Sequence, residues 1–527
     1  MQSLELHARR ASSAAASSSS TPVCSSTTII RVHRRHLRDV SASGTSASAG
    51  PVLQRRRTQL ARPRGEHLDL YVSLDKDVLT PQNTLGYGEA LRVGLKALKL
   101  LGIQGITVDI YWGLVEKKPQ QYDWQGYRSL LRMICDMGFR TKVNLCFHST
   151  PHTPLPQWIL DIGSKNPDIF YTDKSNTRCQ EYLSLGIDDL PALNGRTGLE
   201  VYRDFMQSFR DEFNPWLGNN IAEVLIGLGP NGELRYPSYP DDKRWEYPGV
   251  GEFQCYDRYM LATLKACAEQ VRQPSWGLGG PHDACRYKEW PHQSNFFHHN
   301  GSWASAYGKF FLQWYSEMLL RHAHAVVGAA GEVLGDAPVQ LNARLPLCHW
   351  WHNTASHAAE LTAGYYHTSA REGYLPAFKV LAHHGVGVHL AGAEQRNSEK
   401  QGSHCADPEK LLLLQRTVAA ALHMPVTAEN SDVRFDEGAL ARIEATLFDN
   451  ASSQGIEVPQ VRALSFNRMS DAMFEPNNWQ AFKNFIRKVR ERADLAAAQA
   501  SQPSLDYEQL AEGAKGGSAS VVHLARR

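Results

Sequence analysis

Eight short runs of apolar and β-branched residues recur in this chain from residue 68 onward, separated by amphipathic helical patterns. The predicted strands cover residues 68–74, 103–112, 141–147, 221–228, 339–347, 385–393, 425–430 and 462–468. The helical patterns include residues 90–101, 199–213, 304–327, 409–422 and 478–490. Strands that alternate with helices form a parallel sheet with crossover connections. Eight such units predict an α/β fold, a (β/α)8 TIM barrel with long loops over its C-terminal face.

One interval departs from this alternation. Residues 240–301 contain a single helical pattern, residues 253–270, followed by a stretch rich in Gly, Pro, His and Trp. Long connections in a compact domain often carry binding or catalytic residues. We therefore interpret this interval as a large insertion over the mouth of the barrel. The 527 residues contain no run of 18 or more apolar residues, so the sequence predicts neither a membrane span nor a membrane partner.

The first segment differs in composition from the rest. Residues 1–64 are rich in Ser and Ala and carry eleven arginines, no lysine and two acids, a net charge of +9 in a chain whose total is +2. Because no long apolar segment is present, we predict that residues 1–65 are a disordered transit peptide for the plastid (chloroplast stroma), favoured over the mitochondrion. The alternative is a basic arm that binds nucleic acid through Arg34 and Arg56. No aromatic residues lie among these arginines to contact bases, so we expect no nucleic-acid partner.

The remaining boundaries and the cysteines follow from composition. Residues 66–495 are predicted to form the barrel domain, and residues 496–527, with Ala-rich and Gly-Ser clusters, a partly disordered tail. Nine cysteines form no Cys-x-x-Cys pair and are spread over most of the chain, which indicates reduced thiols. The sequence also contains no phosphate-binding loop and no closely spaced His/Cys set. It therefore predicts no metal site and no cofactor.

Two glutamates stand at the ends of predicted strands. Glu233 follows the fourth strand in a loop rich in Gly, Pro and Tyr, and Glu429 ends the seventh strand. Strands three steps apart in a ring of eight lie nearly opposite each other. An inverting glycosidase needs such a pair roughly 6.5–9.5 Å apart, one carboxyl as acid and one as base for a water. The alternative is that each glutamate caps a helix or pairs with a basic neighbour such as Arg235.

Several longer motifs carry a resemblance to a known family. They read GPNGELRYPSYP at 229–240, VDIYWGLVE at 108–116, CFH at 146–148, HWW at 349–351, AAELTAGYY at 358–366 and TAEN at 427–430. These motifs resemble the plant-type β-amylases of glycoside hydrolase family 14, and the resemblance extends from about residue 71 to residue 490. It implies a catalytic domain with Glu233 as general acid and Glu429 as general base.

The resemblance also implies a set of substrate contacts at matching positions. These are Asp109, His148, Arg344, His349, Trp350, Ala391, Asn430, Ser431 and Arg468. Each has a structural alternative. Asp109 could be a buried strand-end acid, His148 a core histidine and Trp350 a packing aromatic. Arg468 could serve to neutralise Glu394.

The chain departs from the family pattern at some of these positions. The glycine-rich lid after His148, which ends in an aspartate, is shortened here to residues 149–154. Ala391 replaces a threonine that contacts substrate, and Arg344 replaces a lysine. Residues 431–432 are Ser-Asp, which would place an extra acid near the base and raise the pKa of Glu429. All of these changes fall on contacts with substrate.

Two functions follow as hypotheses. The first is exo-acting, inverting hydrolysis of α-1,4-glucosidic bonds in starch or maltodextrin from non-reducing ends, which releases β-maltose with low activity. The alternative is a catalytically silent homologue that binds glucan or regulates starch metabolism. The expected partner in both is an α-1,4-glucan, and the sequence does not specify a protein partner.

Overall fold

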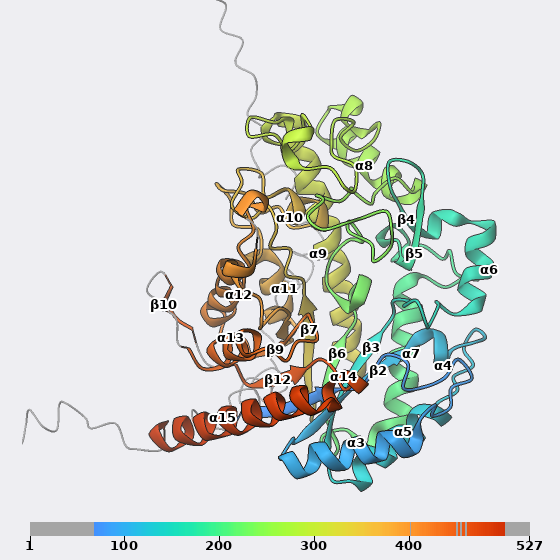
Figure 1. Ribbon diagram of the computed structural model, residues 1–527. Helices are drawn as coiled ribbons and strands as arrows, with labels where there is room; N and C mark the ends of the chain where they lie inside the picture. Colours follow the sequence, from blue (N-terminus) through green and yellow to red (C-terminus); the bar gives the residue numbers. More distant parts are fainter. Residues whose placement is uncertain (1–67, 401, 450–451, 454–455, 459–460, 501–527) are drawn as a thin grey trace, which may run out of the picture.

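The computed structural model describes residues 68–400, 402–449, 452–453, 456–458 and 461–500, and its eight main strands form a closed parallel barrel (Figure 1). The barrel strands are β1 (Asp69–Ser73), β2 (Gly105–Tyr111), β3 (Arg140–Cys146), β6 (Ile221–Ile226), β7 (Gln340–Leu345), β8 (Gly387–Leu390), β9 (Val426–Glu429) and β12 (Ala463–Phe466). Each strand pairs with the next along the chain, and β12 pairs with β1 to close the ring. The predicted TIM barrel is confirmed, and every predicted strand run overlaps one of these strands.

The helices expected from the sequence surround this barrel. They are α3 (Gly88–Leu101), α7 (Gly198–Phe213), α9 (Ala306–Leu334), α12 (Pro408–Ala421) and α15 (Pro476–Ala500). In α7, Val201, Phe205 and Phe209 recur every four residues and are buried, so one stripe of the helix packs against the barrel. The helix begins at a capping box, in which Thr197 and Glu200 each bond the other's backbone N–H. Helix α15 continues five residues beyond the predicted domain boundary at 495.

Four further helices of nine residues or more, within the described residues, lie on connections where the sequence predicted no helix. They are α5 (Gln125–Asp136), α6 (Gln157–Lys165), α11 (Leu375–His383) and α13 (Glu437–Phe448). The predicted helical pattern 253–270 begins later than expected, as α8 (Arg258–Gln270). The reason is that the Asp257 carboxylate accepts the backbone N–H groups of Tyr259 and Met260, which makes it the N-cap.

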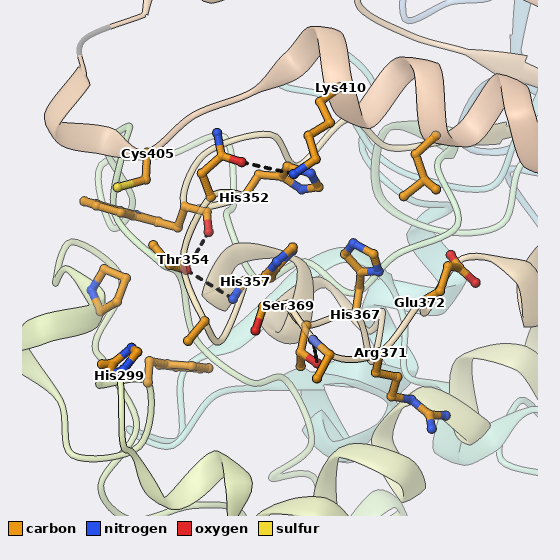
Figure 2. A pocket seen from close by; sticks show the side chains of 18 of the residues that line it. His299, His352, Thr354, His357, His367, Ser369, Arg371, Glu372, Cys405 and Lys410 are labelled. Atoms are coloured by element: carbon orange, nitrogen blue, oxygen red, sulfur yellow. Dashed lines mark hydrogen bonds between the residues drawn. The ribbon is translucent and has the colours of Figure 1, made fainter. Parts of the chain in front are cut away.

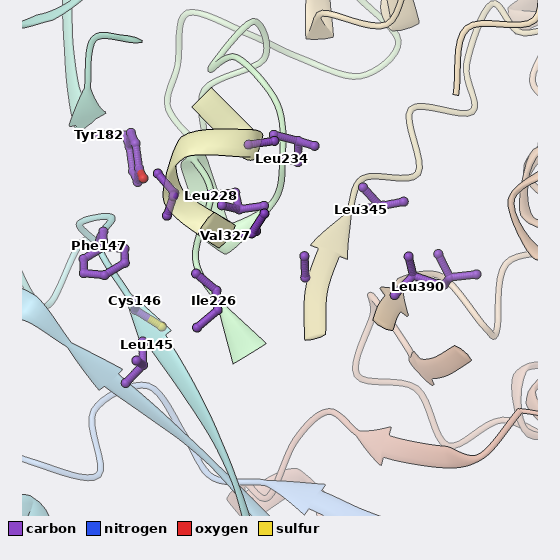
Figure 3. Close-up of a cluster of buried hydrophobic side chains, with 14 of the residues drawn as sticks. Leu145, Cys146, Phe147, Tyr182, Ile226, Leu228, Leu234, Val327, Leu345 and Leu390 are labelled. Carbon is purple, nitrogen blue, oxygen red and sulfur yellow. The ribbon is translucent and has the colours of Figure 1, made fainter. Parts of the chain in front are cut away.

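The strands alternate between an apolar and a polar face. Along β3, Val143 and Leu145 are buried among hydrophobic neighbours, and Figure 3 shows Leu145 in a cluster with Ile226, Val327 and Leu390. Lys142 lies on the opposite face and reaches residues of β8 and β12 across the ring. The period of two in a strand therefore separates a hydrophobic layer under the helices from a polar barrel interior.

Long connections gather on one side of the barrel. They include α8, the short helix α10 (Ala358–Ala363) and the hairpin of β4 (Phe170–Thr172) and β5 (Arg178–Leu183) (Figure 1). The predicted insertion at 240–301 belongs to this group and consists of α8 and short turns. None of the helices within the described residues is both long and apolar enough to cross a membrane. The predicted transit peptide and most of the predicted tail lie outside the described residues.

Candidate functional site

Glu233 lies in the tight loop that follows β6. Gly229 permits this turn, because a Cβ there would lie 2.5 Å from the Glu233 carbonyl oxygen. The Glu233 side chain is buried, and Arg235 donates from Nε to its Oε2 at 2.6 Å. The Arg235 guanidinium in turn stacks 3.9 Å over the Tyr239 ring. The pairing of Glu233 with Arg235 that the sequence suggested as an alternative is therefore present.

Glu429 is the last residue of β9 and is also buried. The Arg344 guanidinium lies against both of its oxygens, with Nε 2.9 Å from Oε1 and Nη2 donating to Oε2 at 3.0 Å. His389 Nε2 lies 3.0 Å from Oε2. Burial by itself raises the pKa of Glu429, but the charge of Arg344, the hydrogen bond from His389 and the charge of Lys142 outweigh that effect and lower it well below 4.5.

Arg344 connects the two glutamate-bearing segments. Its Nη1 donates to the Asn231 carbonyl at 2.8 Å, two residues before Glu233, while Nη2 holds Glu429. The backbone of Leu234 donates to the Arg344 carbonyl at 3.0 Å, which fixes the Glu233 loop to the end of β7. Glu233, in the loop after β6, and Glu429, at the end of β9, thus follow strands three steps apart in the ring, as predicted, and Arg344 contacts both segments.

A buried lysine that the sequence analysis did not select lies beneath Glu429. Lys142 is fully buried, 3.6 Å from Glu223 and 3.0 Å from His389 Nδ1, and donates to Ser465 at 3.3 Å. Thr427 is 2.7 Å from the same Nδ1. Burial lowers the pKa of His389 to about 4, so the ring is neutral at pH 7. Because Nδ1 then accepts from Lys142, the ring proton is on Nε2 and faces Glu429.

The pairing register explains why these groups meet. Lys142 is the cross-strand partner of Glu223, and Arg344 is the partner of His389. A lone lysine in an apolar strand run gives no signal of its partners, because partners are set by register between strands far apart in sequence.

Asp109 and Arg468 also meet at the mouth. Asp109 accepts from its cross-strand partner Asn144 at 2.7 Å, and Arg468 Nη1 lies 3.8 Å from Asp109. Burial raises the pKa of Asp109, but Arg468, Arg344 and the Asn144 hydrogen bond lower it overall. Asp109 is thus ionised and has room to accept further hydrogen bonds.

His148 is brought to the same region. A Cβ at Gly232 would lie 3.6 Å from both His148 Cε1 and Arg344 Nη1. His148 is buried, its Nδ1 has no hydrogen-bond partner, and burial lowers its pKa to about 3. A neutral ring with an unused Nδ1 is suited to bonding a sugar hydroxyl.

The aromatic residues of the 349–351 segment are buried, whereas the neighbouring Tyr247 is exposed. Trp350 is 5% exposed, packs on Tyr239 at 5.1 Å and donates to the Gly249 carbonyl, so in this structure it serves as a packing aromatic. His349 is buried, and burial lowers its pKa to about 3. Tyr247, which the sequence analysis did not select, is 41% exposed and lies 5.9 Å from the His349 ring. It offers the open ring face on which a sugar can stack.

Two of the predicted contacts, Asn430 and Ala391, have little to offer a ligand through their side chains. Asn430 is engaged with Asn467, accepting its backbone N–H at 2.7 Å and receiving the Asn467 amide on its own carbonyl at 2.9 Å. Ser431 uses its backbone N–H on a buried carboxylate. Ala391 is buried at the end of β8 and has no polar group. Ser431 itself is exposed, so its side-chain hydroxyl is the group at these three positions that can contact substrate.

For the neighbouring acids, the alternative that Arg468 neutralises Glu394 is not realised, and the prediction that Asp432 raises the pKa of Glu429 is wrong. Glu394 accepts the backbone N–H groups of Ser431 and Asp432, so it holds this turn and is not the partner of Arg468. The Asp432 carboxylate accepts from the Gln395 amide at 3.0 Å and is not among the principal charges that act on Glu429. The pKa of the base is accordingly lowered and not raised, because three cationic or imidazole groups are closer to it.

The shortened segment after β3 is a compact turn. Thr150 and Thr153 exchange backbone hydrogen bonds of 2.8 and 3.2 Å, and α6 begins at Gln157. The Pro154 carbonyl packs so closely on Gly113 that a Cβ there would lie 1.9 Å away. A ten-residue connection closed in this way contains no extended lid, which leaves the mouth less shielded from water.

The lowered pKa of Glu429 predicts acid sensitivity. Its ionised form stabilises the fold above the unfolded-state pKa of 4.5, and this contribution is lost as pH falls through the lower folded-state value. The free energy of unfolding of the parent minus that of Glu429→Gln should be constant above about pH 5 and decline below about pH 4.5. Urea denaturation across this range measures it, and a difference that grows on acidification would contradict the assignment.

A second cluster of polar groups lies away from the two glutamates. His352, His357, Glu360 and His367 are all buried, and one ligand atom from each lies within 4.8 Å of the others. The sequence prediction of no metal site did not anticipate this arrangement. The four residues are spread over sixteen positions of a loop, and only the path of that loop brings them together.

Comparison with known proteins agrees with this geometry. Residues 71–495 match the profile of the family described as "Glycosyl hydrolase family 14". "Beta-amylase 1, chloroplastic" from Arabidopsis thaliana is 40% identical over 441 residues, covering 82% of this chain and 77% of that protein. "Inactive beta-amylase 4, chloroplastic" from the same plant is 42% identical over 418 residues, covering 76% and 77%.

A solved structure is similar in fold. The crystal structure of the catalytic domain of β-amylase from Paenibacillus polymyxa superposes with a TM-score of 0.65 at 23% identity. The match covers 81% of this chain and all of that one. With a closed eight-stranded barrel, glutamates at the ends of the fourth and seventh strands and a family profile that spans most of the chain, this protein belongs to glycosyl hydrolase family 14.

Proposed function

We propose that this chain binds the non-reducing ends of α-1,4-glucans, such as starch and maltodextrin, and hydrolyses them slowly to β-maltose. The reaction is exo-acting and inverting. Glu233, in its protonated form, gives a proton to the leaving glycosidic oxygen. Glu429, ionised, takes a proton from a water that attacks the anomeric carbon from the opposite face.

The observation that carries this proposal is the placement of the two glutamates. They end strands three steps apart at the mouth of the barrel, where active sites of this fold lie. Asp109 and His148 lie in the same region with unused hydrogen-bonding capacity, which suits the hydroxyl groups of a terminal glucose.

The slow rate follows from the surroundings of the base. The Arg344 guanidinium contacts both Glu429 oxygens, so an attacking water must compete with it for the same lone pairs. A strongly lowered pKa also makes Glu429 a weak proton acceptor near neutral pH. Ala391 supplies no hydroxyl, and the compact turn at 150–153 does not close over the substrate.

A second candidate function is a catalytically silent protein that binds glucan or regulates starch metabolism. The Arg344–Glu429 pair favours it, because the guanidinium lies against both carboxylate oxygens and competes with water for them. Among the relatives, one that is 42% identical is named an inactive β-amylase, while others are named simply as β-amylases. The two candidates share the glucan and differ in turnover.

We also place the protein in the plastid. Relatives from rice and Arabidopsis that are about 40% identical to this chain carry the word chloroplastic in their names. The basic, Ser-rich composition of residues 1–64 is typical of a transit peptide. Fluorescence from a fusion of residues 1–70 to a fluorescent protein would coincide with chlorophyll if this assignment is right.

Maltose release tests the catalytic proposal. Residues 66–527 should release β-maltose from soluble starch, and Glu233→Gln and Glu429→Gln should each reduce the rate about a hundredfold or to background, because each removes one proton-transfer step. The anomeric form of fresh product, followed by polarimetry or NMR, checks for inversion.

Glu212→Gln is the matched control, since Glu212 pairs with Arg128 between α5 and α7 outside the barrel. It should leave the rate unchanged. Glucan binding by all four proteins separates the candidates. Binding without any release by the parent would favour the silent protein, and release that persists in both active-site variants would exclude the proposed chemistry.

A further inference from the structure

A cavity lies beside the histidine cluster. Its volume is about 1150 Å³, and its lining includes His352, His357 and His367 (Figure 2). The rings of His352 and His357 are 4.7 Å apart between centroids, and His367 lies 4.6 Å from His357. Three imidazoles therefore meet at one wall of a space that is open to small solutes.

A buried carboxylate completes the group. Glu360 is fully buried, and its Oε2 lies 3.0 Å from His352 Nδ1 and 2.9 Å from His357 Nδ1. Tyr374 donates its hydroxyl to the other oxygen, Oε1, at 2.8 Å. This outer hydrogen bond orients the carboxylate so that Oε2 faces the imidazoles, as outer partners of metal ligands do.

We propose that His352, His357, His367 and Glu360 form a binding site for a divalent transition metal, with Zn²⁺ as the preferred ion. Four protein ligands around one point are the donor set of a structural zinc site. With Zn–N and Zn–O bonds of about 2.0–2.1 Å, tetrahedral ligand atoms are about 3.4 Å apart. The four ligand atoms already lie within 4.8 Å of one another, so a shift of roughly an ångström completes the site.

The donor types exclude the common hard cations. Ca²⁺ requires six to eight oxygen ligands and Mg²⁺ a near-octahedral shell of oxygens, whereas Glu360 is the single oxygen donor among these four residues. Imidazole nitrogen suits Zn²⁺, Ni²⁺ and Cu²⁺, and no thiolate belongs to the group. On binding, the metal takes the place of the Nδ1 protons that His352 and His357 share with Glu360, and each ring then carries its proton on Nε2.

Such a metal would hold together the loop that follows β7. His367 Nδ1 accepts the backbone N–H of Gly373 at 3.1 Å. To bind the metal, the ring gives up that contact or uses its other nitrogen, Nε2. The same loop is hydrogen-bonded to the segment at 404–405 through Trp351 and Asn353. The metal site therefore fixes the loop that also carries His349 and Trp350. The metal site can exist whether or not the protein hydrolyses glucan.

Cobalt binding tests the site. The full chain without a histidine tag is stripped with a chelator, titrated with Co²⁺ and then with Zn²⁺, and its metal content is measured after gel filtration. We expect one equivalent of metal per chain, the strong visible d–d bands of tetrahedral Co²⁺, and their loss when Zn²⁺ displaces it. Because the ion binds the folded chain, Zn²⁺ should also raise the melting temperature.

Matched glutamine variants identify the ligands. His352→Gln keeps an N–H that can donate to Glu360, and His367→Gln is similar in size, so both variants should fold. Each should weaken Co²⁺ binding by more than tenfold, since even outer-shell changes at metal sites cost about 10–100-fold. His299→Gln is the control, because His299 lines the same cavity outside the cluster and should bind as the parent does.

The double variant His352→Gln/His367→Gln measures binding by other histidines of the chain. Tetrahedral cobalt bands in the parent and in His299→Gln, absent from the double variant, would establish the site. Equal affinity in the parent and the double variant would overturn it, as would a parent that retains no metal. A circular dichroism spectrum matching the parent confirms that each variant is folded.

Discussion

Replacing Arg344 with lysine is expected to raise the rate of maltose release at least tenfold. The guanidinium contacts both oxygens of Glu429, whereas an ammonium is a compact point charge that can satisfy one oxygen and leave the other for water. The positive charge is kept, so Glu429 remains ionised and still has a cationic partner. Initial rates on soluble starch and maltopentaose, at equal protein concentration, measure the change.

Three further variants test whether this gain in rate depends on Glu429. Glu429→Gln combined with Arg344→Lys should return the rate to background, because the gain depends on an ionised base. Arg128→Lys alters an arginine–glutamate pair outside the barrel and should change nothing. Adding Ala391→Thr should increase the gain if the missing hydroxyl also limits the rate. An unchanged rate in Arg344→Lys and in the combined Ala391→Thr variant would contradict our account of the slow turnover.

Replacing Lys142 with methionine is expected to lower the free energy of unfolding by about 3–5 kcal/mol. Lys142 is fully buried inside the barrel, where Glu223, His389 and Ser465 surround its ammonium group. Methionine fills a similar volume but leaves the buried Glu223 carboxylate without its cationic partner. Equilibrium urea unfolding followed by tryptophan fluorescence measures the loss.

The double variant Lys142→Met/Glu223→Gln separates the lost pair from lost packing. Because it removes both charges, it should recover part of the stability lost in the single variant. Lys96→Met, at an exposed position of α3, is the control and should change the free energy of unfolding by less than about 0.5 kcal/mol. A single variant as stable as this control would show that the buried charge is not required for the fold.

The sequence was sufficient to predict the barrel and the placement of the glutamates on it. Short apolar runs alternating with helical patterns specify eight parallel units, and parallel strands bring their carboxyl ends to one side. Glu233 and Glu429 therefore had to lie near the mouth. The start of α8 was misplaced by five residues, because the capping role of Asp257 outweighs the apolar pattern before it.

Tertiary structure decided what each of these side chains touches. Arg344 meets Glu429, and Lys142 meets His389, because the register between strands brings together residues far apart in sequence. Arg468 pairs with Asp109 and not with Glu394 for the same reason.

The metal-ligating cluster is the clearest example of an arrangement that the tertiary structure decides and the sequence does not predict. Hydrophobic periodicity and turn residues report local structure and burial, which are properties of neighbouring positions. His352, Glu360 and His367 converge through the fold of a long loop, whose path is set by packing against the rest of the molecule. The sequence by itself determined the barrel, its family and the ends of the strands that carry the two glutamates. Only the tertiary structure decided the charge around the base and the meeting of the histidines, because both depend on contacts between distant segments.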